Sequence, residues 1–148
     1  TAMEIIDAVD GPIDGFCSGI GTGGTITGIG EVLKEHNPNM TIWAVEPVDA
    51  AILSGGSIGT HLQMGIGDGL IPAILNCDIY NDICIVKDDE AILTAKELAS
   101  KEGIMCGISS GTNVAAALRL AKKLGKGKTV VTVLPDTAER YFSTPLFR

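Results

Sequence analysis

The chain has 148 residues, of which 45% are hydrophobic and 20% are charged, a composition typical of one globular domain. Its formal net charge of −7 argues against nucleic acid or an anionic membrane surface as a partner, and no apolar stretch is long enough to cross a bilayer. The four cysteines show no spacing typical of a metal site, so we expect no metal and reduced thiols in a cytoplasmic protein.

The first quarter of the chain predicts a helix, a strand and a second helix. Residues 2–10 form an acidic amphipathic run that starts without a methionine, and we expect it to lie partway along a longer protein. The apolar run IDGFCSGI, residues 13–20, predicts a buried strand that leads into a glycine-rich loop. Helical spacing of apolar residues begins at Thr25 and stops at Asn37–Pro38.

The middle of the chain predicts a strand followed by a long irregular connection. TIWAVEP, residues 41–47, is β-branched and aromatic and ends at a proline. Residues 48–76 are rich in glycine and serine and contain a second glycine cluster, GIGDGLIP, at 65–72. Connections of this length in a compact domain are more often functional than idle.

The remaining elements alternate again. DICIVKD, residues 82–88, predicts a strand, and we expect Asp88 to cap a helix that ends before Gly103. A third glycine cluster, GISSGT at 107–112, opens a helix that Gly125 stops. KTVVTVL, residues 128–134, predicts the last strand.

Alternating strands and helices predict an α/β fold over residues 1–148. We expect a single domain with three layers, in which an open, largely parallel twisted sheet has helices on both faces. Each glycine cluster follows a strand or opens a helix, so the three clusters should meet at the carboxyl edge of the sheet. Open α/β sheets bind their ligands at that edge.

The first glycine loop permits two interpretations. Gly19, Gly21 and Gly24 match the G-x-G-x-x-G pattern of dinucleotide sites, and Glu46 ends the next strand near the spacing of a ribose-binding acid. A lone match of this kind is weak, and for Glu46 we favour the role of a structural acceptor at a strand end over that of a ribose ligand. The alternative is a phosphate monoester, because free amides at a helix N-terminus bind anionic oxygens. The hydroxyls of Thr22 and Thr25, with Thr27 as a third candidate, favour the monoester.

The third cluster contains the adjacent serines Ser109 and Ser110. One serine before a helical run is explained as an N-cap and needs no function. Two serines exceed what one cap requires, so Ser109 is a candidate to turn its hydroxyl toward a ligand at the sheet edge.

Five segments together resemble cysteine synthases (O-acetylserine sulfhydrylases), a family of fold type II pyridoxal-phosphate enzymes. The segments, in the family's order, are SGIGTGGTITGIG, WAVEP, GIGDGLIP, EGIMCGISSGTNVAAALRLAK and VVTVLPDTAERYFST. The resemblance runs from about residue 4 to the end of the chain.

The resemblance implies pyridoxal 5′-phosphate as cofactor and assigns its contacts. The implied cofactor-binding residues are Gly21, Thr22, Gly23, Gly24, Thr25, Gly65 and Ser109. The first five would hold the phosphate, Gly65 would lie beside the cofactor, and Ser109 would hydrogen-bond the pyridine nitrogen. Two positions depart from the family pattern: Asp68 replaces a small apolar residue and is expected to alter the cleft, and Asp136-Thr137 replaces a serine pair.

The resemblance also implies the reaction. A neutral serine leaves the pyridine ring a milder electron sink than a carboxylate would, which favours β-replacement over transamination. The family converts O-acetylserine and sulfide into cysteine and acetate, and its small-molecule amino-acid substrate, a homodimer and serine acetyltransferase as a partner are implied with it. Cystathionine β-synthase is the alternative enzyme, and a non-catalytic binding half or a dinucleotide-binding module are the alternatives from other classes.

The family's Schiff-base lysine has no counterpart in this chain. That lysine lies in an early S-V-K-D-R-like motif, whereas the eight lysines here lie outside any such motif. The resemblance therefore predicts that residues 1–148 are the C-terminal, phosphate-binding part of a two-domain enzyme. We expect no turnover by this chain alone, because the lysine is needed for proton transfer at Cα.

Overall fold

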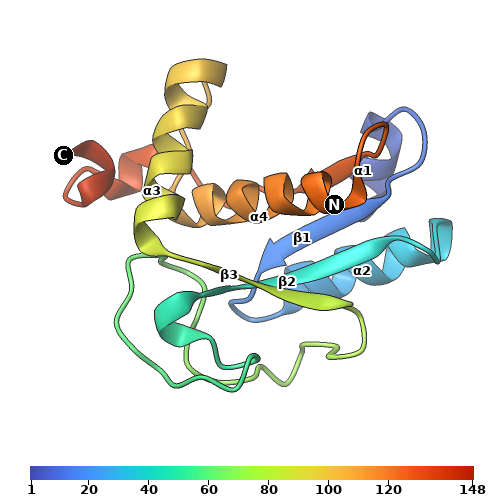
Figure 1. The fold of residues 1–148 in the computed structure, drawn as a ribbon, viewed down its shortest axis with the longest axis horizontal. Coiled ribbons are helices and arrows are strands. Elements are labelled where there is room, and N and C mark those ends of the chain that lie inside the picture. Colours follow the sequence, from blue (N-terminus) through green and yellow to red (C-terminus); the bar gives the residue numbers. More distant parts are fainter.

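Four parallel strands form the centre of the structure, a computed structural model that describes residues 1–148. They are β1 (Gly15–Gly19), β2 (Thr41–Pro47), β3 (Asp82–Val86) and β4 (Val130–Thr132), in the spatial order β3-β2-β1-β4 (Figure 1). The pairing aligns Cys17 of β1 with Trp43 on one side and Thr132 on the other. All three strand pairs are parallel, which confirms the predicted sheet.

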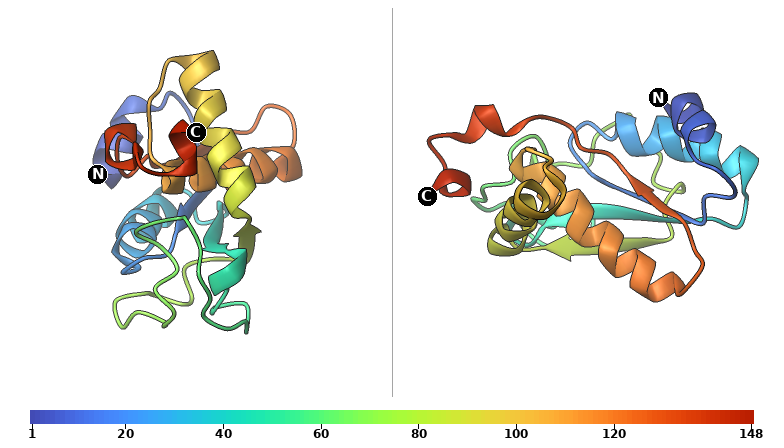
Figure 2. Two further views of the ribbon diagram at one scale, coloured as in Figure 1. Left: turned by 90° about the vertical axis from the view of Figure 1, so that its left-hand side faces the viewer. Right: turned by 90° about the horizontal axis from the view of Figure 1, so that it is seen from above.

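Helices cover both faces of this sheet, also as predicted. The four α-helices are α1 (Ala2–Ala8), α2 (Gly24–His36), α3 (Asp88–Glu97) and α4 (Ile108–Leu124). In Figure 2, α1 and α2 lie on one face of the sheet, and α4 lies on the other face beside α3. The core between α1, α2 and the sheet contains Phe16 and Ile42, while the core beneath α3 and α4 contains Cys17 and Val45. Neighbouring strand residues point to opposite faces, so a sheet covered on both sides needs strands that are apolar throughout.

Short helical turns join and end these elements. A π-helical turn, Leu98–Glu102, extends α3 as far as Gly103, whose positive φ of 71° ends it as predicted. Three 3₁₀ turns cover Val48–Ala50, Ala138–Tyr141 and Pro145–Phe147. No helix is both long and apolar enough to span a membrane.

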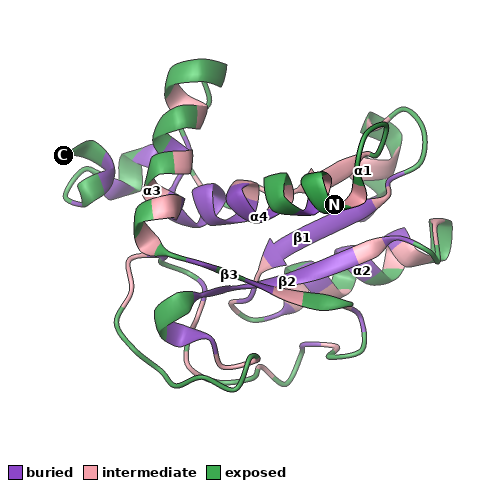
Figure 3. Ribbon diagram, viewed as in Figure 1, coloured by how far each residue is buried: buried purple, intermediate pink, exposed green.

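Residues 51–81 form a connection that contains neither helix nor strand, and it runs past the carboxyl end of β2 before returning to β3 (Figure 1). Most of it is exposed or half-buried, whereas the strands are largely buried (Figure 3). The exceptions include Gln63 and Ile66, whose side chains are buried. The sequence correctly predicts this irregular stretch and its glycine cluster.

Three local expectations are wrong. α4 begins at Ile108 with Gly107 as its N-cap, so both serines lie inside the first turn. Asp88 is the first residue of α3 and makes no cap hydrogen bond, because its carboxylate accepts from Leu62 N instead. β4 is shorter than predicted, and just beyond it the carbonyl of Val133 accepts a side-chain hydrogen bond rather than a strand partner.

Candidate functional site

The glycine loop between β1 and α2 presents free backbone amides. The N–H groups of Gly21, Thr22 and Gly23 donate to no backbone carbonyl in the chain. Gly23 is the N-cap of α2 and has a φ of +83°, and a Cβ there would lie 2.7 Å from that of Leu75. Only glycine therefore fits this turn. The unpaired N–H groups lie at the N-terminal, positive end of the α2 dipole, an arrangement suited to an anion.

A second glycine segment, Gly65–Gly67, packs against the first. The amide of Gly67 donates to the carbonyl of Ile20 at 2.9 Å. A Cβ on Gly21 would collide with the carbonyl oxygen of Gly65, so the two backbones touch where no side chain can stand between them. The prediction that separate glycine clusters meet at the carboxyl edge of the sheet is confirmed for these two.

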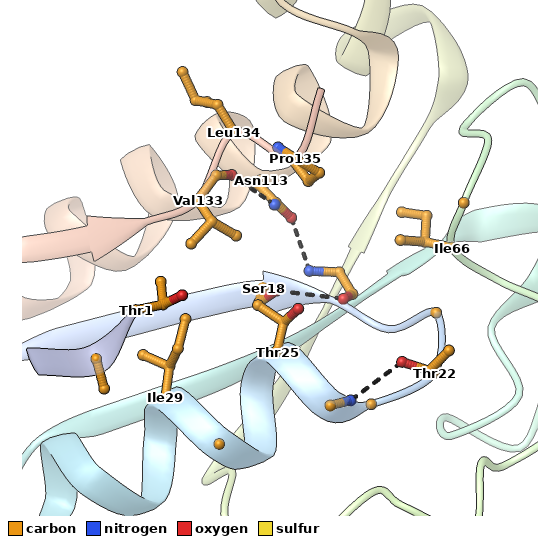
Figure 4. Close-up of a pocket in the computed structure, with 17 residues that line it drawn as sticks. Thr1, Ser18, Thr22, Thr25, Ile29, Ile66, Asn113, Val133, Leu134 and Pro135 are labelled. Carbon is orange, nitrogen blue, oxygen red and sulfur yellow. Dashed lines mark hydrogen bonds between the residues drawn. The ribbon is translucent and has the colours of Figure 1, made fainter. Parts of the chain in front are cut away.

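A cavity of about 950 Å³ lies in front of these loops. Six of the seven residues that the resemblance assigns to the cofactor line it: Gly21, Thr22, Gly23, Gly24, Thr25 and Gly65. Two of them carry hydroxyl groups: Thr22 lies on the loop and Thr25 at the start of α2 (Figure 4). None of the lining residues is lysine, arginine or histidine. An anion bound here would therefore be held by amides and hydroxyls rather than by cationic side chains.

Thr22 and Thr25 keep hydroxyl hydrogens available to a ligand. The Thr22 oxygen accepts the Gly24 N–H at 3.4 Å and donates to no protein atom, and Thr25 makes no side-chain hydrogen bond. Thr27, the third candidate, does not join them. Its hydroxyl donates to Ile74 O at 3.5 Å and accepts from Asn76 N at 3.0 Å, which holds it against the 51–81 connection.

Asn113 of α4 is a lining residue that the sequence reasoning missed. Its side chain is 1% exposed, its Oδ1 accepts the Gly19 amide at 2.7 Å, and its Nδ2 donates to Val133 O at 2.8 Å (Figure 4). It thereby joins the carboxyl ends of β1 and β4 to α4. The available signal was a lone amide side chain in an otherwise apolar helical run, four residues after Ser109.

Ser109 is not among the residues that line the cavity. Its side chain is 4% exposed, and its hydroxyl has no hydrogen-bond partner within the chain. Residues four apart lie on one side of a helix, so Ser109 shares the side of α4 on which Asn113 reaches the cavity. Ser110 is buried and directs its hydroxyl to the carbonyl of Asp136 at 3.5 Å.

Asp136 packs beneath the start of α4. Its carboxylate accepts the Tyr141 hydroxyl at 2.5 Å, and its other oxygen is buried without a partner. Burial, reinforced by this hydrogen bond, raises the pKa of Tyr141 to about 12. A Cβ on Gly107 would collide with the same carboxylate, which explains the glycine at the N-cap. The other departure from the family pattern, Asp68, is exposed and lies outside the cavity lining.

The carboxylate of Glu46 is occupied by residues of the turn that follows β2. Glu46 is 4% exposed, and its carboxylate accepts from Leu53 N at 2.7 Å, Ser54 N at 3.2 Å and Ser54 Oγ at 3.0 Å. These bonds confirm Glu46 as a structural acceptor that ties the end of β2 to the following turn. A ribose hydroxyl would have to replace them, so this carboxylate is unsuited to a dinucleotide site.

The buried thiols are held in the protonated, unreactive form. All four cysteines are free, and Cys77 is exposed while the other three are buried. Burial raises the pKa of Cys17 to about 12 and also raises the pKa values of Cys84 and Cys106. Thiolates are the reactive form of cysteine, so these side chains serve as core residues rather than nucleophiles.

The fold and the cavity define an α/β protein that offers amides and hydroxyls to an anionic ligand at the carboxyl end of a parallel sheet. A family model described as "Pyridoxal-phosphate dependent enzyme" matches residues 1–136. The chain therefore belongs to the pyridoxal-phosphate dependent enzyme family, which confirms the family and the cofactor expected from the five sequence segments.

Individual relatives agree with this assignment. A cysteine synthase from Staphylococcus aureus is 50% identical over 148 residues, which cover 99% of this chain and 48% of the relative. Among solved structures, O-acetylserine sulfhydrylase isoform 3 from Entamoeba histolytica has a TM-score of 0.95 and 40% identity, over 99% of this chain and 44% of that one. An O-acetylserine dependent cystathionine β-synthase from Helicobacter pylori has a TM-score of 0.94 and 36% identity, over 99% and 48%. The chain thus spans about half the length of the relatives it matches.

The residues present fit the family's cofactor. The glycine loop supplies the unpaired amides that a phosphate monoester requires, and the close approach of Gly21 and Gly65 leaves those amides uncovered by side chains. A serine hydroxyl without a protein partner stands on the side of α4 that faces the cavity.

Proposed function

We propose that this chain forms the cofactor-phosphate-binding part of a cysteine synthase that converts O-acetylserine and sulfide into cysteine and acetate. The observation that carries the proposal is the row of unpaired amides at the start of α2, directly beside Gly65. The similarity to a cysteine synthase over 99% of the chain supports the reaction class. When bound, pyridoxal phosphate supplies an electron sink for the Cα of an amino-acid substrate.

The chain's own residues would then perform two tasks. The amides of Gly21–Thr25 and the hydroxyls of Thr22 and Thr25 would hold the phosphate dianion with charge-assisted hydrogen bonds, which the α2 dipole strengthens. The hydroxyl of Ser109 would donate to the pyridine nitrogen without protonating it, which keeps the ring a weak electron sink. This division separates affinity, set by the glycine loop, from reaction type, set by α4.

The Schiff-base lysine would come from residues outside this chain. None of the residues that line the cavity is a lysine, and the relatives are about twice as long. We propose that residues 1–148 are the C-terminal domain of a two-domain enzyme, and that turnover requires the N-terminal domain with its lysine and substrate-carboxylate loop. A homodimer, an association with serine acetyltransferase and a cytoplasmic location belong to the same proposal. The four free cysteines support a reducing compartment.

A cystathionine β-synthase type of β-replacement is the second candidate, because a structure of that name shares the fold over 99% of this chain. Both enzymes would hold the cofactor phosphate in the same way, with the amides of Gly21–Thr25 and the hydroxyls of Thr22 and Thr25, which together form the phosphate cradle. They differ in the nucleophile that follows loss of acetate, so assays of the two-domain enzyme with sulfide and with homocysteine distinguish them.

The phosphate cradle is tested by titration with three ligands: pyridoxal phosphate, pyridoxal and NAD. Tight binding is expected only for pyridoxal phosphate, because pyridoxal lacks the dianion and Glu46 is committed to Leu53 and Ser54. The double variant Thr22→Val/Thr25→Val should lose about 2 kcal/mol of binding free energy, a factor of ~30 in Kd. Thr27→Val, on the same helix but outside the cavity, is the matched control. Unchanged affinity in the double variant would contradict the cradle.

Ser109→Ala separates the second task from the first. We expect phosphate affinity to be retained and the rate of β-replacement in the two-domain enzyme to fall, because the pyridine nitrogen loses its donor. Full activity of this variant would remove the role assigned to Ser109.

A further inference from the structure

Gln63 is the one fully buried amide side chain of the 51–81 connection, with 0% of its surface exposed. Its Nε2 donates to Val86 O at 3.0 Å and to Asp88 Oδ1 at 2.8 Å, and its Oε1 accepts the Thr112 hydroxyl at 2.8 Å. A buried amide without partners would destabilise the fold, whereas here both ends of the amide are satisfied.

These bonds join three elements at one point. Val86 ends β3, Asp88 begins α3, and Thr112 lies one turn after Ser109 on α4. The second oxygen of Asp88 accepts the Leu62 amide at 2.7 Å, so the same carboxylate anchors two successive residues of the connection. The segment just before Gly65 is thereby fixed to the end of β3 and to the first turns of α3 and α4.

The segment just after Gly65 is fixed independently. Gly67 N donates to Ile20 O at 2.9 Å, directly before the glycine loop. His61 closes the turn between the two anchors: its Nδ1 accepts Gln63 N at 3.2 Å, and its Nε2 donates to Gly67 O at 3.2 Å. Gly65 and its carbonyl, which touches Gly21, are therefore held between anchors two residues away on each side.

We propose that Gln63 is a positioning residue. Through its bonds to Thr112 and Asp88 it fixes Gly65, which lines the cavity beside the phosphate loop and is called the Gly65 wall below. The same bonds tie this wall to the turn of α4 that carries Ser109. This inference rests on the proposed function for its ligand, pyridoxal phosphate. Gln63 itself does not line the cavity, so it acts through Gly65 rather than by contact. A satisfied polar network suits this task because its bonds are directional, whereas apolar packing tolerates sliding.

Thr112→Val tests the inference without changing the residues that line the cavity and without leaving a void at position 112. Valine matches threonine in shape but leaves Gln63 Oε1 without its donor. We expect the Gly67 amide to exchange its hydrogen about 10-fold faster and the Kd for pyridoxal phosphate to rise about 10-fold, as for one lost buried hydrogen bond. Thr112→Ser retains the hydroxyl and should restore both values to within about twofold of the parent.

Thr94→Val is the matched control, because Thr94 makes the same kind of bond, from its hydroxyl to the carbonyl of Glu90 four residues earlier, but lies on α3 away from the cavity. The single hydroxyl hydrogen of Thr112 is shared between Gln63 Oε1 at 2.8 Å and Ile108 O at 3.2 Å, so both valine variants lose a contact to the carbonyl four residues earlier. The control should change overall stability without changing Gly67 exchange or the Kd. If Thr112→Val behaves like Thr94→Val in both readouts, the positioning role is refuted.

The two readouts separate this inference from the proposed function. Should the parent protein fail to bind pyridoxal phosphate, the proposed function fails, and exchange at Gly67 still decides whether Gln63 fixes the Gly65 wall. Faster exchange at Gly67 in Thr112→Val with rescue by Thr112→Ser supports the inference in that case. Exchange that does not respond overturns it.

Discussion

Replacing Asn113 by alanine should be costly, because its side chain satisfies two backbone groups at once. Truncation leaves Gly19 N and Val133 O without their partners at 2.7 and 2.8 Å, in a site where Asn113 is 1% exposed. Each buried group left unsatisfied costs about 1–3 kcal/mol, so for two groups the expected loss in the free energy of unfolding is about 2–6 kcal/mol. Urea denaturation followed by far-UV circular dichroism measures it.

Asn81→Ala is the matched control for this variant. Asn81 also accepts a strand amide, that of Ile42 at 2.8 Å, but it is exposed and water can replace it. Its loss should cost about 1 kcal/mol. The reasoning is refuted if Asn113→Ala destabilises the protein no more than Asn81→Ala does. Asn113→Ala should also weaken binding of pyridoxal phosphate, since the Gly19 amide fixes the start of the phosphate loop.

Three further outcomes are expected. Gly21→Ala should cost about 1–3 kcal/mol of folding free energy, because its Cβ would displace the Gly65 carbonyl. Gly28→Ala has nothing within 4 Å of the new Cβ and should gain about 1 kcal/mol through higher helix propensity. Equal stabilities of the two variants in urea would contradict this expectation. At pH 8, a thiol reagent should modify Cys77 alone in the folded protein and all four cysteines after unfolding; rapid labelling of a second thiol argues against the buried core. Because the folded state raises the pKa of Tyr141 from 10 to about 12, the stability it contributes is complete below about pH 10 and is lost as the pH rises toward 12. Tyr141→Phe should remove that part of the alkaline loss, and an unchanged alkaline profile would exclude it.

The sequence predicted the sheet and its helices well because both layers leave periodic patterns. Strand β2 is found at the predicted residues 41–47, and α2 ends at His36, one residue before the predicted stop. Boundaries failed where side-chain bonds compete with local preference. Aspartate is a residue type typical of helix N-caps, yet the Asp88 carboxylate accepts hydrogen bonds from Leu62 and Gln63 instead. These residues lie about 25 positions earlier in the sequence, so no local rule detects the interaction.

The candidate site divides in the same way. Glycines and threonines in a loop before a helix are readable in order along the chain, and Gly21 to Thr25 do line one cavity. Thr27 is also a threonine and lies two residues after Thr25, but the 51–81 connection occupies its hydroxyl. Asn113 could not be assigned, because its two partners, Gly19 and Val133, lie 94 and 20 residues away in the sequence.

By itself the sequence determined the α/β class, the glycine loop and the family resemblance, and it led to the proposal of an anion held by amides, since each depends on residue type and short-range spacing. Only the tertiary structure decided which polar side chains face the cavity, that Gly65 touches Gly21, and that Glu46 serves the fold. Those outcomes depend on where distant segments meet, and a hydroxyl or carboxylate bonds to whichever partner the packing brings within about 3 Å.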